Sequence, residues 1–293
     1  MNELKQVGER TFYVDSASKM GICLYGSGKA CLVDSGMGDG HGKLALEIIE
    51  GRGWTLGMII NTHSHADHVG GNRFLQEATG CPAYAEGIEA SIIKNSILNT
   101  SLLYGGNPPE FVKNGLLYSI PSEIKELSDS VLPPDVTAMR LDGHSCAMTG
   151  VRSPDGVWFL ADALSSVSML AKYHIPFIRD VAKHLETLSA VKNLSGRLFI
   201  PSHVKPLEET GPLADANRRK VLEIAEKILD ILAEPACFED LLKSLFDYYG
   251  LTMEINQYML AGSTVRSFLS YLADMGKITH IVSGNRLLWE TSR

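Results

Sequence analysis

The chain has 293 residues, a length that predicts one large domain or one domain with a small module. Its 45% hydrophobic and 21% charged residues are the balance of an ordinary globular protein and exclude a disordered or collagen-like chain. The net charge of −7 argues against a sequence-independent nucleic-acid binder, because such proteins neutralise phosphates with lysine and arginine.

The first part of the chain alternates short apolar strands with turns and helices. The segment 36–42 contains four glycines and is expected to be a loop. The expected strands are 12–14, 20–25, 30–34 and 57–61, and the expected helices are 43–50 and 69–77.

Residues 87–134 differ in character, because a predicted helix at 88–103 is followed by a stretch that glycine and proline interrupt. We interpret this stretch as an insertion over a site. Its apolar side chains also offer a surface on which two chains could pair as a homodimer. Beyond it we expect strands at 136–141, 150–152, 157–161 and 197–200, with an amphipathic helix at 178–192.

The composition changes after Pro206. A charged linking helix with an apolar stripe is expected at about 215–233, and Pro235 ends it. The remaining elements have the order of a winged helix: helices at 238–246, 254–261 and 264–275, then strands at 277–282 and 286–290. We therefore predict a larger domain at 1–234, with its insertion at about 87–134, and a winged-helix-like domain at 235–293.

The cysteines form no C-x-x-C pair, so the five thiols indicate a reduced, cytoplasmic protein rather than a disulfide framework or a cysteine-only zinc site. Counting back from a turn at 26–29 places Cys23 opposite Leu32 and not facing Cys31. No run of about 18 apolar residues occurs, and charges break up the N-terminus, so we expect neither a membrane span nor a secretory signal.

Five predicted strands each end in a histidine or an aspartate just past the last apolar residue. If these strands belong to one sandwich, the five side chains converge on one rim. They are Asp34, His63, His144, Asp162 and His203.

One of these strand ends carries four ligand-type residues within six positions, namely His63, His65, Asp67 and His68. On an extended segment His63 and His65 project to the same side. Imidazole suits zinc, iron and nickel, and a carboxylate can bridge two ions. Four such residues exceed what one tetrahedral ion needs from one loop, which indicates two ions.

The segment THSHADHVGG at 62–71 resembles the signature loop of the metallo-β-lactamase superfamily. The other pieces occur in the matching order, as Asp34, Gly143-His144, Leu160-Ala161-Asp162-Ala163 and Ser202-His203. The resemblance covers about residues 10 to 210, and it implies an α/β fold, an αβ/βα four-layer sandwich with metals at one rim. The C-terminal part resembles the winged-helix-like extension of one subgroup of these hydrolases.

The resemblance also implies a ligand set. His63, His65 and His144 would hold the first ion, Asp67, His68 and His203 the second, and Asp162 would bridge them. Asp34 would lie outside this set and orient a ligand or the loop. The chain departs from the common pattern after His144, where Ser145-Cys146-Ala147 replaces the Thr-Pro-Gly of many relatives.

These residues predict a dinuclear metal-dependent hydrolase. Between two divalent ions, zinc first and iron or manganese as alternatives, the pKa of water falls to about 7, and the resulting hydroxide attacks the substrate. Asp67 is the predicted catalytic residue, because it could accept or orient the proton as well as bind metal. The expected substrate is a small ester-like molecule such as a thioester or a lactone.

Three other readings stay open: a phosphodiesterase or ribonuclease, an iron-dependent redox enzyme, and a non-catalytic regulator that binds nucleic acid. The helix at 264–275 carries one basic residue, Arg266, offset by Asp274, whereas DNA readers place several on that face. We therefore favour a wall of the substrate cleft, or packing on the larger domain, over DNA recognition. The roles of His41 and Cys146 stay open.

Overall fold

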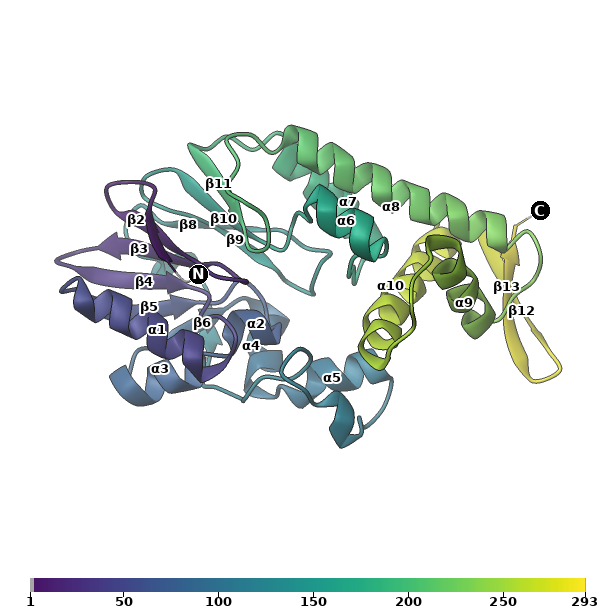
Figure 1. Cartoon of the computed structure of the whole chain (residues 1–293), viewed down its shortest axis with the longest axis horizontal. Coiled ribbons are helices and arrows are strands. Elements are labelled where there is room, and N and C mark those ends of the chain that lie inside the picture. The colour runs from purple at the N-terminus through teal and green to yellow at the C-terminus, as the bar shows by residue number, and fades with distance from the viewer. Residues whose placement is uncertain (1–2, 293) are drawn as a thin grey trace.

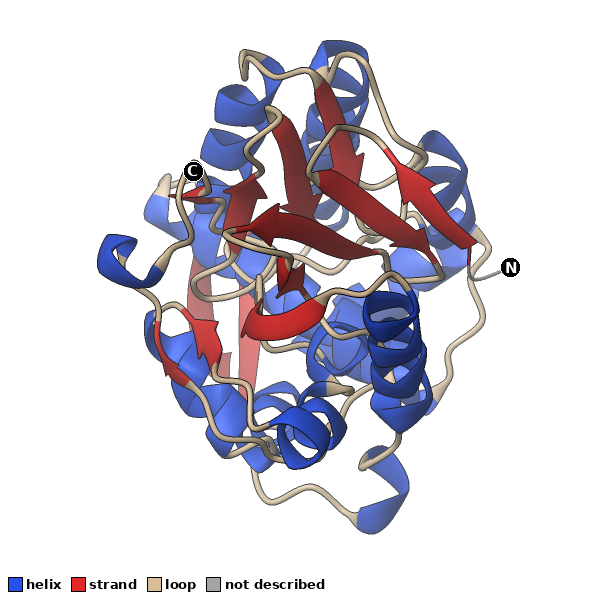
Figure 2. Cartoon of the chain, turned by 90° about the vertical axis from the view of Figure 1, so that its left-hand side faces the viewer, coloured by secondary structure: helices blue, strands red, loops and turns tan. Residues whose placement is uncertain are grey.

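Two β-sheets face each other in the computed structural model, which describes residues 3–292 (Figures 1 and 2). The first sheet has seven strands in chain order: β1 (Glu3–Gln6), β2 (Thr11–Asp15), β3 (Met20–Tyr25), β4 (Lys29–Val33), β5 (Thr55–Ile60), β6 (Ala83–Ala85) and β7 (Lys125–Glu126). Pairing is antiparallel from β1 to β4 and parallel from β4 to β7. The parallel pairs require crossover connections, which helices supply.

The second sheet has four strands in the order β11-β10-β9-β8. They are β8 (Thr137–Arg140), β9 (Thr149–Arg152), β10 (Val157–Ala161) and β11 (Leu198–Pro201). Only β10 and β11 are parallel, and the connection between them contains α6 (Val167–Tyr173) and α7 (Val181–Lys192). The strands predicted from apolar runs are thus present, with ends that differ by one or a few residues.

The remaining helices lie between strands or follow the second sheet. They are α1 (Gly38–Gly51), α2 (Ala66–Val69), α3 (Asn72–Thr79), α4 (Gly87–Lys94), α5 (Ile97–Tyr104), the 3-10 helices η1 (Glu110–Val112) and η2 (Asp129–Val131), α8 (Gly211–Ile231), α9 (Phe238–Tyr249) and α10 (Ile255–Asp274). The chain ends in a hairpin of β12 (Ile278–Ser283) and β13 (Arg286–Thr291). None of the described helices combines the length and apolar character needed to cross a membrane.

Buried side chains divide the molecule into layers. Between the sheets, Ile60 of the first packs in one cluster with Phe159 of the second. The outer face of the first sheet packs against α1 and α3 through Ile49 and Leu75. The outer face of the second sheet packs against α7 and α8, where Leu188 belongs to the cluster. The order helix, sheet, sheet, helix is the mixed α/β arrangement expected.

The C-terminal helices extend the outermost helical layer. Figure 1 shows α8 running from the sandwich toward α9 and the terminal hairpin. Leu241 of α9 and Phe268 of α10 belong to the same buried cluster as Leu188 of α7 and Ile224 of α8. Beyond residue 235 two helices, α9 and α10, precede the hairpin, whereas the sequence predicts three helices and a hairpin. The domain boundary near residue 235 stays a prediction.

Several predicted helices differ from the structure. The predicted helix at 88–103 is divided into α4 and α5. The predicted loop at 36–42 is wrong for residues 38–42, which form the start of α1. A Cβ on Gly42 would lie 2.9 Å from the Gly71 carbonyl oxygen, so its absence lets this helix approach α3. The predicted helices 254–261 and 264–275 are one helix, α10, in which buried Gly262 faces Phe238.

The predicted cysteine register is also wrong. Cys23 pairs with Cys31 across β3 and β4, because the hairpin loop has three residues, not four, and Tyr25 pairs with Lys29. Gly26 and Gly28 adopt positive φ in this loop, a backbone conformation that glycine permits. Both thiols are buried and free, and burial raises the pKa of Cys23 to about 12.

The shared helical core predicts a large effect of one substitution. Phe268 is fully buried between α10 and its neighbours, so Phe268→Ala should lower the free energy of unfolding by about 3–5 kcal/mol. Val282→Ala, in the exposed terminal hairpin, should change it by less than about 0.5 kcal/mol. Urea denaturation measures both values, and equal losses would contradict this packing.

Candidate metal centre

Seven histidine and aspartate side chains gather where strands of both sheets end. Their ligand atoms form two groups, each with all atoms within 4.8 Å of one another. The first group is His63, His65, His144 and Asp162, and the second is Asp67, His68 and His203. The sequence placed all seven at one rim, and the structure brings them together there.

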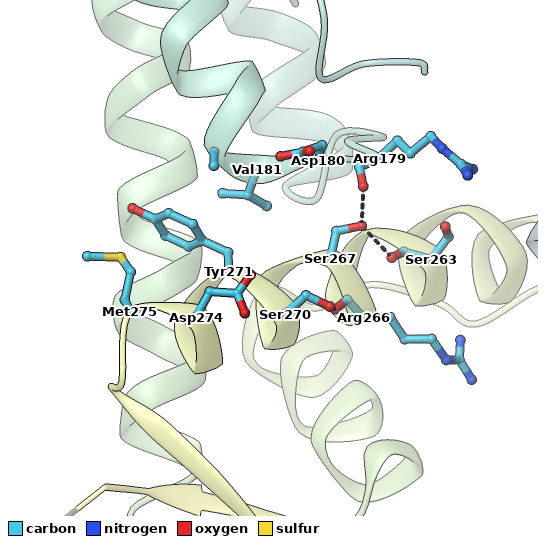
Figure 3. A pocket seen from close by; sticks show the side chains of 11 residues that line it. Arg179, Asp180, Val181, Ser263, Arg266, Ser267, Ser270, Tyr271, Asp274 and Met275 are labelled. Atoms are coloured by element: carbon cyan, nitrogen blue, oxygen red, sulfur yellow. Dashed lines mark hydrogen bonds between the residues drawn. The ribbon is translucent and has the colours of Figure 1, made fainter. Parts of the chain in front are cut away.

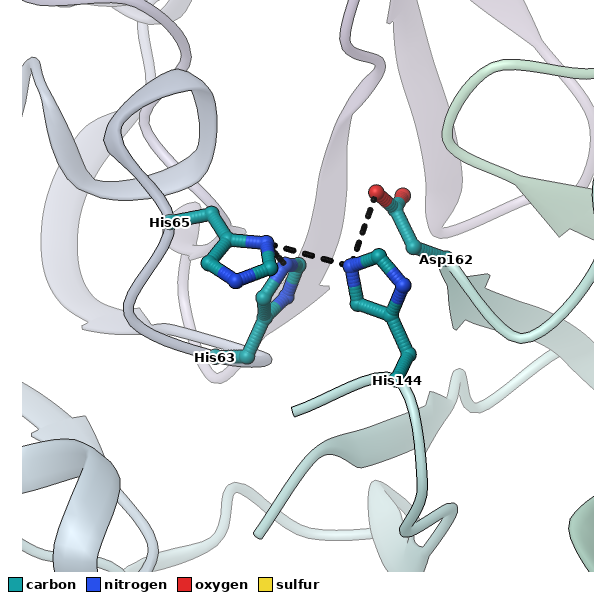
Figure 4. Close-up of side chains that lie close together, drawn as sticks. All are labelled: His63, His65, His144 and Asp162. Carbon is teal, nitrogen blue, oxygen red and sulfur yellow. Dashed lines mark hydrogen bonds and ion pairs between the residues drawn. The ribbon is translucent and has the colours of Figure 1, made fainter. Parts of the chain in front are cut away.

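Three imidazoles of the first group point their ring nitrogens at a common space (Figure 4). His65 Nδ1 lies 3.0 Å from His63 Nε2 and 3.1 Å from His144 Nε2. His144 Nδ1 lies 3.2 Å from the Phe177 carbonyl oxygen, which can only accept a hydrogen bond. Nδ1 therefore carries the proton, and the neutral ring turns the lone pair of Nε2 toward the other histidines.

A backbone carbonyl oxygen also orients a histidine ring of the second group. His203 Nδ1 donates to the Ala17 carbonyl oxygen at 2.8 Å, which directs Nε2 toward Asp67 Oδ2 at 3.2 Å. His68 is fully buried, and its Nε2 lies 3.5 Å from the same Asp67 oxygen. One carboxylate and two imidazoles thus converge on a second space.

Asp162 stands between the two groups. Its carboxylate lies 3.5 Å from His144 Nε2 of the first group, and 3.4 Å from His68 Nε2 and 3.3 Å from His203 Nε2 of the second. Its buried Oδ1 has no hydrogen bond of good geometry and only the 3.4 Å contact with His68 Nε2. A buried carboxylate oxygen with so weak a contact is costly, so this atom is suited to a cation between the groups.

Asp34 orients His68 and the signature loop. Its Oδ2 accepts from His68 Nδ1 at 2.8 Å and from the Thr62 hydroxyl at 2.8 Å, while Oδ1 accepts from the Thr62 amide at 2.7 Å. The residue has a φ of 61°, and Ala161, directly before Asp162, has a φ of 49°. Such strained backbone at two strand ends is typical of functional sites.

Burial and charge act differently on the two groups. Burial lowers the pKa of His65 and of His144 to about 4, and holds the pKa of His63 well below its usual value. The charge of Asp162 raises the pKa of His203 to about 10. Burial opposes a charge on His68, but carboxylates including Asp67 outweigh it and raise the pKa well above normal.

The residues present fit a pair of divalent cations. The first group offers neutral imidazoles whose lone pairs face one another, an arrangement that requires a proton or a cation among them. In the second group protonated His68 and His203 balance the carboxylates, and bound cations would replace these protons. Imidazole and carboxylate together are donors that zinc, iron and manganese accept.

Glu89 is a residue that the sequence analysis did not identify. It lies on α4 and is fully buried, and its two oxygens accept from the backbone amides of Ser64 at 2.9 Å and Ala147 at 2.8 Å. One carboxylate thus ties the loop of His63 and His65 to the loop of His144. The spacing of Glu89 from the buried Ile92 and Ile93 places it on the same helix face. An acidic residue on that apolar face was the signal in the sequence.

Gly143 fixes the backbone before His144. Its φ is 114°, and a Cβ there would lie 2.3 Å from the His184 amide nitrogen. Its carbonyl oxygen accepts from the amides of Arg179 and Asp180 at the start of α7. His184 itself is buried, and burial lowers its pKa to about 3.

A cavity of about 420 Å³ opens in front of the two groups. His65, Asp67 and His203 are among its lining residues, together with Phe177, whose ring packs edge-on against His65 and His144. The insertion and α10 also contribute to its wall. His41 and Cys146, whose roles the sequence left open, do not line it.

A second cavity of about 480 Å³ lies between the start of α7 and α10 (Figure 3). Ser267 lines this cavity, and its hydroxyl donates a hydrogen bond to the Arg179 carbonyl oxygen at 2.7 Å. No residue of the two ligand groups lines this cavity, so it is separate from the candidate metal centre.

Comparison with known proteins agrees with this picture. A family model described as the metallo-beta-lactamase superfamily matches residues 22–203. A beta-lactamase domain protein from Burkholderia ambifaria is similar over 99% of this chain and 94% of its own, with 18% identity and a TM-score of 0.76. A metallo-beta-lactamase family protein from Thermus thermophilus covers 99% of this chain and 98% of its own, with 18% identity and a TM-score of 0.70.

Two curated relatives match over short stretches. A hydroxyacylglutathione hydrolase from Methylococcus capsulatus is 48% identical over 56 residues, which are 19% of this chain and 20% of the relative. One from Erythrobacter litoralis is 41% identical over 59 residues, 20% of this chain and 22% of the relative. The chain thus spans about a fifth of the length of the curated relatives it matches.

His65 offers the sharpest test of the first group. We expect His65→Ala to abolish binding at that group, because one of its three converging imidazoles is removed. Metal content after loading and desalting measures the effect. His280→Ala removes a histidine from the terminal hairpin and is the control; equal metal content in the two variants would contradict the assignment.

Glu89 offers a second test. Glu89→Gln replaces one acceptor oxygen by an amide that faces a backbone donor, so we expect a loss of about 1–3 kcal/mol in stability and weaker metal retention against a chelator. Glu77→Gln, which makes the same change on exposed α3, is the control. Unchanged retention in Glu89→Gln would exclude a positioning role.

Proposed function

Because the chain belongs to the metallo-beta-lactamase superfamily, we propose that it is a metal-dependent hydrolase of small ester-like acyl compounds, with thioesters as the first class to test. The observation that carries this proposal is the pair of ligand groups, with the Asp162 carboxylate within 3.5 Å of imidazoles from both. Lactones and other small esters belong to the same reaction class. The short curated matches, named hydroxyacylglutathione hydrolase, support thioesters.

The ligand set follows the two groups. His63, His65 and His144 would hold one divalent ion, Asp67, His68 and His203 would hold a second, and Asp162 would bind both. When bound, such ions polarise a substrate carbonyl oxygen and lower the pKa of water. The donor set suits zinc, with iron and manganese as alternatives.

Asp67 is the residue we assign to proton transfer. It lines the cavity, where a substrate would reach it, and its Oδ2 is within 3.5 Å of imidazoles from His68 and His203. Burial raises its pKa, but the neighbouring imidazoles lower it more, so the carboxylate stays ionised and can accept a hydrogen bond from water and orient its proton. The contacts from Phe177, Ala17 and Asp34 keep the surrounding rings in place.

We further propose that residues 235–293 form a winged-helix-like module that walls the cleft. Gln257 and Leu260 of α10 line the cavity beside the ligand groups. Arg266, the basic residue of the helix that would read DNA, lies over the Phe238 ring at 3.6 Å from its centre. This contact supports a packing role.

Zinc-loaded protein should hydrolyse S-acyl thioesters, lose the activity with a chelator and regain it with zinc. Asp67→Ala should lower kcat by at least about 100-fold, because the carboxylate that would bind the second ion and orient the proton is removed. Release of free thiol measures the rate.

Arg266→Ala is the control and should leave turnover nearly unchanged, since Arg266 lies in the second cavity. A fully loaded protein without activity on thioesters, lactones and other esters would exclude the proposed function. Collapse of activity in Arg266→Ala would overturn the separation of the two cavities.

A further inference from the structure

The cavity in front of the ligand groups has an apolar wall built from three parts of the chain. Leu103 and Leu117 come from the insertion, Leu260 comes from α10, and Phe177 comes from the segment between α6 and α7. The four side chains belong to one apolar cluster. The sandwich therefore supplies the chemistry, whereas elements outside it form the surface that a substrate would contact.

The insertion and α10 are held together at this wall. Asn114 of the insertion donates to the Asn256 side-chain oxygen at 3.1 Å, and Met259 of α10 is buried in one cluster with Leu103 and Leu117. These contacts hold the insertion against α10, so the apolar wall is part of the folded structure.

Outside the ligand groups, the described residues that line this cavity carry no positive charge. Among the residues that the structure describes around this cavity, none is lysine or arginine, and the polar ones outside the ligand groups are Asn99, Ser165, Tyr173 and Gln257. A carboxylate or phosphate that entered would lose its water without gaining a cationic partner from the wall. An apolar group would gain from leaving water, by about fourfold in affinity for each buried methylene.

We propose that this cleft selects substrates with an uncharged, apolar acyl group and discriminates against acyl groups that carry a carboxylate or a phosphate. The inference rests on the proposed function and names its substrate class. It also disfavours phosphodiesters, whose charged backbone would have to pass the same wall. The proposal concerns the acyl group alone and sets no requirement on the leaving group.

A series of acyl thioesters of one small neutral thiol tests the inference on zinc-loaded, full-length protein. From acetyl to butanoyl to hexanoyl, kcat/KM should rise by about fourfold per methylene until the cavity is filled. For the succinyl thioester, in which a carboxylate replaces the terminal methyl group of butanoyl, kcat/KM should fall at least about tenfold below that of butanoyl. A flat series, or a succinyl rate equal to the butanoyl rate, would overturn the inference.

A charge placed on the wall gives a second test. Leu116 lines the cavity and is 47% exposed, so Leu116→Lys can be accommodated at the mouth. We expect the variant to raise kcat/KM for succinyl relative to butanoyl by at least about tenfold, with unchanged metal content. Leu102→Lys is the matched control, because Leu102 is 49% exposed on the same insertion and does not line the cavity. An equal change of the ratio in both variants, or none in either, would contradict the assignment.

The two proposals fail in different ways. Turnover of acetyl, succinyl and hexanoyl thioesters at similar rates leaves the hydrolase proposal standing and overturns the apolar selection. Absence of turnover with every acyl compound, on protein shown to be metal-loaded, overturns both. Faster cleavage of a phosphodiester such as bis(p-nitrophenyl) phosphate would also overturn both.

Discussion

The structure depends on the electrostatic balance between buried carboxylates and the imidazoles that surround them. Asp34 is buried at the end of its strand, and Asp162 and Asp67 lie beside it and line the cavity. Such charges are stable there only when they are paired. His68 and His203 provide the pairing through their raised pKa values, and divalent cations would provide it more strongly.

The loops that carry these side chains are held in place by contacts outside the ligand groups. Glu89 fastens two of them through backbone amides, and Gly143 permits a backbone path that a side chain would block. The carbonyl oxygens of Phe177 and Ala17 each fix one ring nitrogen of a histidine. Ring orientation, which decides whether a nitrogen can bind a metal, is therefore set by atoms outside the ligand groups.

The sequence predicted the strands and the rim at which the candidate ligands gather, because apolar runs followed by histidine or aspartate are local patterns. It did not predict features that depend on packing between distant segments. Glu89 acts on loops 25 and 58 residues away, and the helical start of α1 depends on the approach of Gly42 to Gly71. The strand register at Cys23 depends on whether the hairpin loop has three residues or four. The apolar wall, likewise, needed the meeting of the insertion with α10.

The central claim is that the two groups of side chains bind a pair of divalent ions. The most direct measurement is the number of zinc ions per chain, determined by mass spectrometry of metals after loading and desalting, for the unmodified chain and for His63→Ala and His203→Ala. The account predicts about two ions in the unmodified chain and a loss of about one in each variant. Retention of no zinc by the unmodified chain, or the same zinc content in all three proteins, would contradict it.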